Sequence, residues 1–276
     1  MRTSQLQETS RGVIQHVYVD PVKGVDTNPG TMSMPFQTIT AALASITDAS
    51  AVKRYAVVLA PGNYVENVVM IPWVTIVGAS FGVDSAMIQA PVGHTVTFPA
   101  AMAGDGAAVE NVRIECQDPA VASRGVFCDN GGSGTLRNCS VANTGGGDGT
   151  ECVAGGVLLH YDCAVLAVAA PASSHDGFGG YVGGSYTGDG VAPDVVLTAA
   201  AVVILTPDVQ LGNLTINVVA GATIMPRTSM LMIPGVELNP ANWAPGPGGP
   251  TPLDLLEAID RIATQVVVLS AAVPIP

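Results

Sequence analysis

The chain has 276 residues, enough for one large domain or two small ones. Apolar residues make up 48% of it and charged residues only 12%, with 32 glycines and 20 prolines, a composition that favours many short strands joined by turns. The net charge of −12 argues against nucleic acid and anionic membrane surfaces as partners, because both require a basic face.

The start of the chain, 1–16, is interpreted as a polar N-terminal arm. It lacks the apolar stretch of a signal peptide, and no apolar run in the chain reaches the roughly 18 residues of a membrane span. We therefore expect neither export nor membrane insertion. With no export signal, and with five cysteines, an odd number, we also expect free thiols in a reducing compartment rather than disulfides.

A strand signal at 17–20 is followed by a short helix signal. Phe36, Ile39, Ala42, Leu43 and Ile46 recur at helical spacing. Such a helix can lay its apolar side over the first turn of a stack of strands, whose open end would otherwise be an exposed sheet edge. We therefore predict a capping helix here.

The residues that follow carry a family resemblance. The stretch 55–64 reads YAVVLAPGNY, Glu66-Asn67-Val68 comes next, and 74–78 reads VTIVG. With the preceding strand and helix, this opening resembles the pectin-lyase-like β-helix proteins, including the pectin methylesterases, in which an "APG-x-Y-x-E-x-V" coil starts the solenoid. The resemblance implies a right-handed parallel β-helix. It implies little about function, because the same fold hosts lyases, hydrolases, esterases and non-catalytic viral proteins.

An internal repeat organises the middle of the chain. Cys128 and Cys139 recur at one constant spacing as Cys152 and Cys163, and a third copy, with Gly179-Gly180, is expected at the same spacing further on. An earlier copy at 110–114 precedes 137–141 by a slightly longer interval. Apolar residues alternate within each copy, and turn-forming residues fill the gaps. One repeat therefore holds short strands and no helix, which predicts an all-β solenoid with about 24 residues per coil.

Strand signals continue beyond position 190, and the chain then changes character. The stretch 240–252 is dense in Pro and Gly and is interpreted as a linker. A helix is predicted within 253–276, with its start signal at Thr251-Pro252. We therefore divide the chain into an N-terminal arm (1–16), a parallel β-helix (17–239), the linker (240–252) and a C-terminal helix and tail (253–276).

The C-terminal helix carries a heptad seam. Its apolar residues step by 4, 3, 4 and 3, and isoleucine stands at both kinds of seam position, which favours trimers. We expect this seam to join a homotrimer, with the flank of the β-helix itself or a capsid surface as the alternative places for it to dock. The seam residues are Leu255, Ile259, Ile262, Val266 and Leu269.

The resemblance also indicates where an esterase site would lie. The family's esterases use a Gln, two Asp and an Arg on adjacent coils, and Gln117-Asp118 is similar to their Gln-Asp pair. Pro119 follows where their motif continues Thr-Leu, and no Arg-x-Trp appears downstream, since Trp73 and Trp243 lie elsewhere. We therefore interpret Gln117-Asp118 as a polar turn between coils.

Other carboxylate chemistry finds candidates without a fixed spacing. The lyases of the family need acidic calcium ligands beside an arginine, for which Asp118 and Asp129 with Arg124 are the best set. A glycosidase needs two facing carboxylates. Most candidates adjoin glycine, where Asp is an ordinary turn residue. They are Asp105, Asp118, Asp129, Asp148, Asp176 and Asp189.

The glycine runs and the cysteines do not predict a cofactor or metal site. The runs at 131–134 and 145–149 lack the Gly-Lys-Ser/Thr of a phosphate loop and the tandem nonapeptides of a calcium roll. Cys152, His160 and Cys163 lack the close pairing of zinc ligands. We interpret the cysteines of the repeat as a ladder of small core residues and expect no cofactor. The ladder comprises Cys128, Cys139, Cys152 and Cys163.

Two classes of function remain open. The broken motifs favour a non-catalytic structural protein, and the arm, solenoid and terminal helix resemble the layout of phage appendages. We therefore expect a virion component, assembled in the host cytoplasm with capsid or tail proteins: a capsid decoration, head fibre or tail-spike protein. The alternative is a polysaccharide-active enzyme or a carbohydrate-binding module. Tyr161, Phe178, Tyr181 and Tyr186 would supply its sugar-facing surface.

Overall fold

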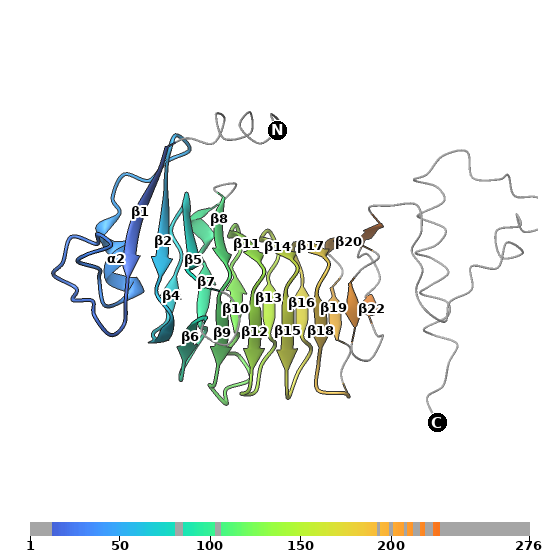
Figure 1. Ribbon diagram of the computed structural model, residues 1–276. Coiled ribbons are helices and arrows are strands. Elements are labelled where there is room, and N and C mark those ends of the chain that lie inside the picture. Colours follow the sequence, from blue (N-terminus) through green and yellow to red (C-terminus); the bar gives the residue numbers. More distant parts are fainter. Residues whose placement is uncertain are drawn as a thin grey trace, which may run out of the picture.

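In the computed structural model the described residues are 13–80, 85–102, 106–191, 194–198, 201–206, 209–211, 216–218 and 223–226. They form a parallel β-solenoid whose chain passes through three sheets in turn (Figure 1). This confirms the predicted fold. No described helix is long and apolar enough to cross a membrane.

The first sheet has nine strands, and the second and third have seven each. The first contains β1 (Val13–Val19), β2 (Lys53–Leu59), β5 (Val74–Gly78), β8 (Ala107–Glu110), β11 (Ser133–Arg137), β14 (Val157–Tyr161), β17 (Phe178–Val182), β20 (Val202–Leu205) and β23 (Thr223–Pro226). The second contains β3 (Gly62–Val65), β6 (Ala86–Ala90), β9 (Arg113–Cys116), β12 (Ser140–Asn143), β15 (Ala164–Ala167), β18 (Ser185–Thr187) and β21 (Gln210–Leu211). The third contains β4 (Val68–Val69), β7 (Val96–Phe98), β10 (Val126–Cys128), β13 (Thr150–Cys152), β16 (Ser173–His175), β19 (Val195–Leu197) and β22 (Ile216–Val218).

The strand register confirms the first two steps of the repeat and corrects the third. Cys128 pairs with Cys152, and Glu110 pairs with Arg137, as their spacings predicted. Gly179-Gly180 pairs with Leu158-Leu159, so it is not a copy of Gly155-Gly156. The reason is a shorter turn: only 176–177 separate β16 from β17, whereas 153–156 separate β13 from β14.

A recurring corner joins the first sheet to the second. Asn111, Asn138 and Asp162 all have left-handed backbones, with φ of 55°, 50° and 50°. Asn and Asp tolerate this conformation better than other residues with a side chain, which explains the repeated Asn or Asp before an inward-facing residue. The Asn138 side chain also donates to Asn111 Oδ1 at 2.8 Å, so successive corners are linked.

The predicted capping helix is present as α2 (Ile39–Ser45), beside β1 at the N-terminal end (Figure 1). Two carboxylates from outside the helix bind the backbone at its start. Asp26 accepts from Gln37 N–H and Thr38 N–H at 2.9 and 2.8 Å. Glu66, the Glu of the family-like coil, accepts from Ile39 N–H at 2.9 Å. These bonds satisfy N–H groups that a short helix leaves unpaired.

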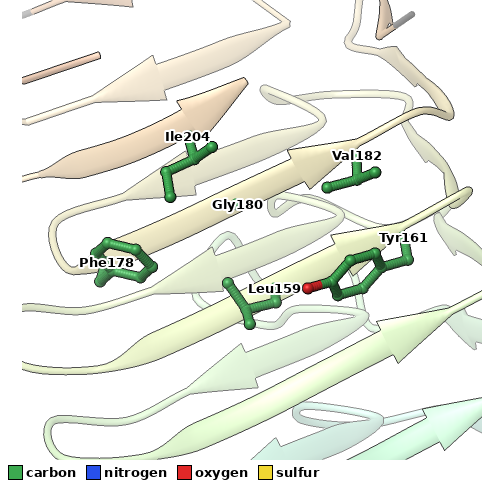
Figure 2. A pocket seen from close by; sticks show the side chains of 6 residues that line it. All are labelled: Leu159, Tyr161, Phe178, Gly180, Val182 and Ile204. Atoms are coloured by element: carbon green, nitrogen blue, oxygen red, sulfur yellow. The ribbon is translucent and has the colours of Figure 1, made fainter. Parts of the chain in front are cut away.

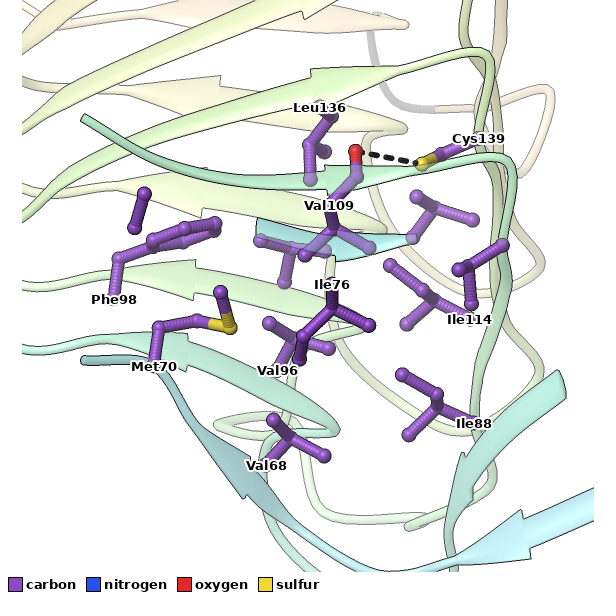
Figure 3. Close-up of a cluster of buried hydrophobic side chains, with 14 of the residues drawn as sticks. Val68, Met70, Ile76, Ile88, Val96, Phe98, Val109, Ile114, Leu136 and Cys139 are labelled. Carbon is purple, nitrogen blue, oxygen red and sulfur yellow. Dashed lines mark hydrogen bonds between the residues drawn. The ribbon is translucent and has the colours of Figure 1, made fainter. Parts of the chain in front are cut away.

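The core lies inside the solenoid. Every second residue of a strand points its side chain inward and contributes to this core. Figure 3 shows part of it, where Ile76, Ile88 and Val96 come from the first, second and third sheets and are each fully buried. Cys139 lies at a corner of this core, with its Sγ 3.3 Å from the Val109 carbonyl oxygen.

One predicted boundary needs correction, and others lie outside the described residues. β1 begins at Val13 because it pairs with β2 residue by residue from Val13 onward, so 13–16 belong to the solenoid and not to the arm. The predicted linker, the C-terminal helix and its seam residues lie outside the described part of the chain.

Candidate functional site

The outer face of the first sheet changes character along the solenoid. One row of outward-facing residues runs through the middle of this sheet, from strand to strand. It passes from Thr135 on β11 to Leu159 on β14, then to Gly180 on β17 and Ile204 on β20. A neighbouring row runs from Arg137 to Tyr161. Polar outward side chains thus give way to apolar ones at β14. The apolar strip, as we name it, comprises Leu159, Tyr161, Phe178, Gly180, Val182 and Ile204 (Figure 2).

Gly180 makes the apolar strip hollow. A Cβ at this position would lie 2.9 Å from Leu159 Cδ2, so the missing side chain lets Leu159 lean across β17. In Figure 2 the other five side chains surround the bare backbone of Gly180. The only polar side-chain atom among them is the Tyr161 hydroxyl. The hollow therefore suits an apolar or aromatic group and offers little for binding a charged ligand.

Arg124 holds a second, polar cluster at the corner between the second and third sheets. Its Nε lies 2.9 Å from Glu151 Oε2 and 3.6 Å from Asp148 Oδ2. The Ser174 hydroxyl donates to the same Asp148 oxygen. Burial raises the pKa of Asp148 and of Glu151, and the Arg124 charge opposes the rise. The cluster therefore ties three neighbouring coils together and leaves its carboxylates occupied.

The glycine run at 145–149 belongs to this corner. An added Cβ on Gly145 would overlap the Asp118 carbonyl oxygen, and one on Gly147 would overlap the Ser123 carbonyl oxygen and the Arg124 guanidinium. Two loops on successive coils thus stack with no room for a side chain between them. The run therefore serves to pack one coil closely on the next.

Asp118, the residue that resembles an esterase Asp, organises its own loop. Its Oδ2 accepts from Gly93 N–H and from the Ser123 hydroxyl, both at 2.6 Å, and its Oδ1 accepts from Ala120 N–H at 3.0 Å. The Gly93 bond first, and the other two after it, lower the pKa of this carboxyl. Asp118 is therefore a fixed anion that bridges two coils.

His94 lies on the outer side of the same corner. Its ring stacks on Phe127 at a centroid separation of 4.3 Å and an angle of 6°. Its Nδ1 accepts from Arg124 N–H at 3.1 Å, which requires a neutral ring nitrogen. Burial, followed by the charge of Arg124, lowers the pKa of His94. This histidine therefore serves as an acceptor for the loop backbone.

A third cluster lies inside the solenoid. The His160 ring stacks on Tyr181 at 4.9 Å and 2°, and the His175 ring meets Tyr181 edge-on at 5.3 Å. Tyr186 closes the group at 4.8 Å from Tyr181. The Tyr181 hydroxyl donates to Ser173 Oγ at 2.7 Å. These five side chains come from all three sheets and are buried.

Burial favours the neutral form of the two interior histidines. Among the described residues, no ring nitrogen of His160 or His175 has a hydrogen-bond partner, and neither has the Tyr186 hydroxyl. Burial lowers the pKa of His175 to about 3 and lowers that of His160 well below its usual value. A sealed interior gives a substrate no access, so the cluster cannot act as a surface catalytic site.

The structure separates residues that the sequence grouped and joins others that it did not. Of the four aromatic residues expected on one sugar-facing surface, Tyr161 and Phe178 lie on the apolar strip, but Tyr181 and Tyr186 point into the core. That expectation was wrong, because neighbouring strand positions face opposite ways. The structure also brings His175 next to His160 in the interior, which the sequence reasoning missed. Ser173 and His175 occupy alternate strand positions and both face inward, but this can be recognised only once the register of the coils is known.

The remaining candidates are dispersed. Cys128 and Cys152 stack in register on the third sheet, Cys139 and Cys163 lie at successive corners, and all four are buried free thiols. No group of three or more His, Cys, Asp or Glu among the described residues could hold a metal ion. Asp105 lies outside the described residues.

The comparison with known proteins found one matching family and several similar solved structures. The stretch 22–142 matches a family described as "Protein of unknown function (DUF1565)", and no curated protein matches the chain. Pectin methylesterase PemA from Erwinia chrysanthemi is similar at 10% identity and a TM-score of 0.48, over 77% of this chain and 66% of that one. A pectin methylesterase in complex with a hexasaccharide gives 10% and 0.45, over 78% and 67%. A GH136 lacto-N-biosidase from Eubacterium ramulus gives 13% and 0.34, over 80% and 57%.

The chain spans slightly less than two thirds of PemA and a smaller share of the lacto-N-biosidase. Its three parallel sheets form a β-solenoid, the architecture that the opening at 17–80 predicted.

Proposed function

We propose that the protein is a non-catalytic structural protein, and more specifically a virion component such as a capsid decoration, head fibre or tail-spike protein. The observation that carries the non-catalytic part is the state of the candidate carboxylates. Each one that the structure describes is already engaged by groups of its own loop or of the next coil.

The engagements differ from site to site. Asp118 holds three donors, and Asp148 faces Arg124 and Ser174. Asp129 accepts from the next backbone N–H at 2.7 Å, Asp176 from the Thr198 hydroxyl, and Asp189 from Val191 N–H at 2.8 Å. A general acid or nucleophile must reach its substrate, and carboxylates that anchor turns do not.

The virion assignment has its support in the layout of the chain. A solenoid stacked coil on coil is a rigid spacer, and a net charge of −12 keeps such a rod soluble. A polar arm and a predicted helix with an apolar seam at opposite ends resemble the anchoring parts of phage appendages. Capsid or tail proteins are the partners that this layout suits.

Two measurements test the proposal. The purified chain, incubated with a panel of pectins and bacterial capsular polysaccharides, should release no reducing ends, unsaturated products or methanol above buffer. Particles purified from the culture that carries the gene should contain the chain after gradient sedimentation. Cleavage that Asp148→Asn or Asp118→Asn abolishes would overturn the non-catalytic part, and absence of the chain from purified particles would overturn the virion part.

A second candidate function is carbohydrate binding or processing. Tyr161 and Phe178 are partly exposed on the apolar strip, and aromatic rings of this kind stack on sugars. The similar solved structures are carbohydrate-active by name. Titration with oligosaccharides by calorimetry tests this reading. Binding that Tyr161→Ala and Phe178→Ala each weaken at least tenfold would favour it over the structural proposal.

A further inference from the structure

The apolar strip lacks a cover among the described residues, although the outer face of a sheet in water is ordinarily polar. The same face is polar one strand earlier, at Ser133, Thr135 and Arg137 of β11. Three outward rows therefore switch together at β14, as the register shows. A coordinated switch of this kind marks a surface that another apolar element covers.

The chain itself leaves the described part of the solenoid next to the strip. β23 pairs with β20 in the first sheet and ends at Pro226, after which the stretch 227–276 follows. The predicted linker, 240–252, would by itself span about 20 Å as a flexible coil. The strip is only three strands wide, about 10 Å. The terminal segment 253–276 can therefore reach it without strain.

The terminal segment has an apolar side of matching size. As a helix, Leu255 to Leu269 would be about 22 Å long, and a strand of the length of β17 spans about 17 Å. Two and a half heptads form a marginal helix alone, so the segment needs an apolar surface to fold against.

Charge complements this match at the polar border of the strip. The Arg137 guanidinium lies 5.2 Å from the Tyr161 ring centroid, and its side chain is 45% exposed, with Glu110 3.6 Å away. The terminal segment carries three acidic residues and one arginine between positions 254 and 261. With the seam over the strip, Asp254 would lie at the flank of the helix, within reach of a border formed by Arg137, whereas Glu257 and Asp260 would face away from the strip.

We propose that the segment 253–276 docks on the apolar strip of its own chain, with its seam residues over the hollow at Gly180. The trimer expected from the same seam is the competing arrangement. This inference does not rest on the proposed function, because it concerns how the chain covers its own surface; a seam docked in this way leaves the polar arm as the anchoring part.

The test uses the full chain and the outward residue Ile204. Hydrogen exchange should show amides of 253–270 protected at least tenfold over a random coil, in a protein whose mass in solution is the monomer's 27.9 kDa. Ile204→Glu should abolish the protection without changing the mass. The matched control is Thr135→Glu, which lies in the same outward row on the polar side and should retain it. The reciprocal change Ile262→Glu should also release the segment, and it leaves the solenoid sequence intact if Ile204→Glu fails to fold.

Three results would overturn the proposal. The first is a wild-type segment that exchanges like a random coil. The second is a trimer that Ile262→Glu dissociates and Ile204→Glu does not, since the seam would then join copies to one another. The third is a dimer that Ile204→Glu disperses while the segment stays protected, since a second copy would then cover the strip.

Discussion

Acidification should destabilise the solenoid through the histidines inside it. His160 and His175 are fully buried, and no charged side chain lies in their cluster among the described residues. The groups packed around them are Tyr181, Tyr186 and the Cys152 thiol, which is the register neighbour of His175. A proton on either ring would therefore place an uncompensated charge in an apolar interior.

The magnitude follows from His175. In an unfolded chain its pKa is about 6.5, and burial lowers it to about 3 in the folded protein. Between these values the unfolded state binds a proton that the folded state does not, so the free energy of unfolding decreases as the pH falls. The full contribution is present above pH of about 6.5, and about 1.4 kcal/mol is lost per pH unit below it. At pH 5 the loss is about 2 kcal/mol, and His160 adds a loss of the same sign.

Chemical denaturation at several pH values between 7.5 and 5.0 measures this effect. His175→Leu, which copies the next residue of the ladder, Leu197, should reduce the slope of stability against pH. Asp148 and Glu151 have raised pKa values that give a slope of the opposite sign, and they are present in both proteins. The difference between the two slopes therefore isolates the histidine.

The control is His16→Gln, which removes an exposed histidine and should keep the wild-type slope. The reasoning would be refuted if His175→Leu and the wild type lost the same free energy between pH 7 and pH 5.

Three further predictions concern the corners that stack the coils. Arg124→Met should lower the free energy of unfolding in urea by about 3 kcal/mol, because it removes the cation beside the buried Asp148 carboxylate and the partly buried Glu151 carboxylate. Arg137→Met should cost less than about 1 kcal/mol, because its ion pair is largely exposed; equal costs would argue that the Arg124 cluster does not hold the coils together. Gly147→Ala should lower the free energy of unfolding by about 2 kcal/mol through overlap with the stacked loop, and Gly106→Ala, which meets nothing within 4 Å, should change it by less than about 0.5 kcal/mol. Asn138→Ala should cost about 1–2 kcal/mol through its left-handed backbone, and Asn138→Gly should cost less; the reverse order would argue against the left-handed backbone as the source of the cost.

The sequence determined the fold because a solenoid repeats its chemistry at short range. Each coil is specified by local preferences: apolar residues alternate along its strands, and a turn-forming Asn or Asp stands at its corner. The next coil repeats the same pattern at a similar spacing, as Cys128 and Cys152 show, so the stack follows from the sum of these local preferences. The helix at 36–46 and the coil around Glu66 were likewise each predicted from local patterns. Only the structure shows that the Glu66 carboxylate accepts hydrogen bonds from the first N–H groups of the helix.

The tertiary structure alone decided which side each residue faces and which coil it meets. A coil shortened by a tighter turn moved Gly180 opposite Leu159, and this opened a hollow that no spacing in the sequence predicted. Tyr161 and Tyr181 both follow the strand pattern, yet one lies on the surface and the other in the core, because the alternation fixes a period of two but not its phase. The phase is set by which face the whole coil buries, and that depends on contacts between residues far apart in the chain.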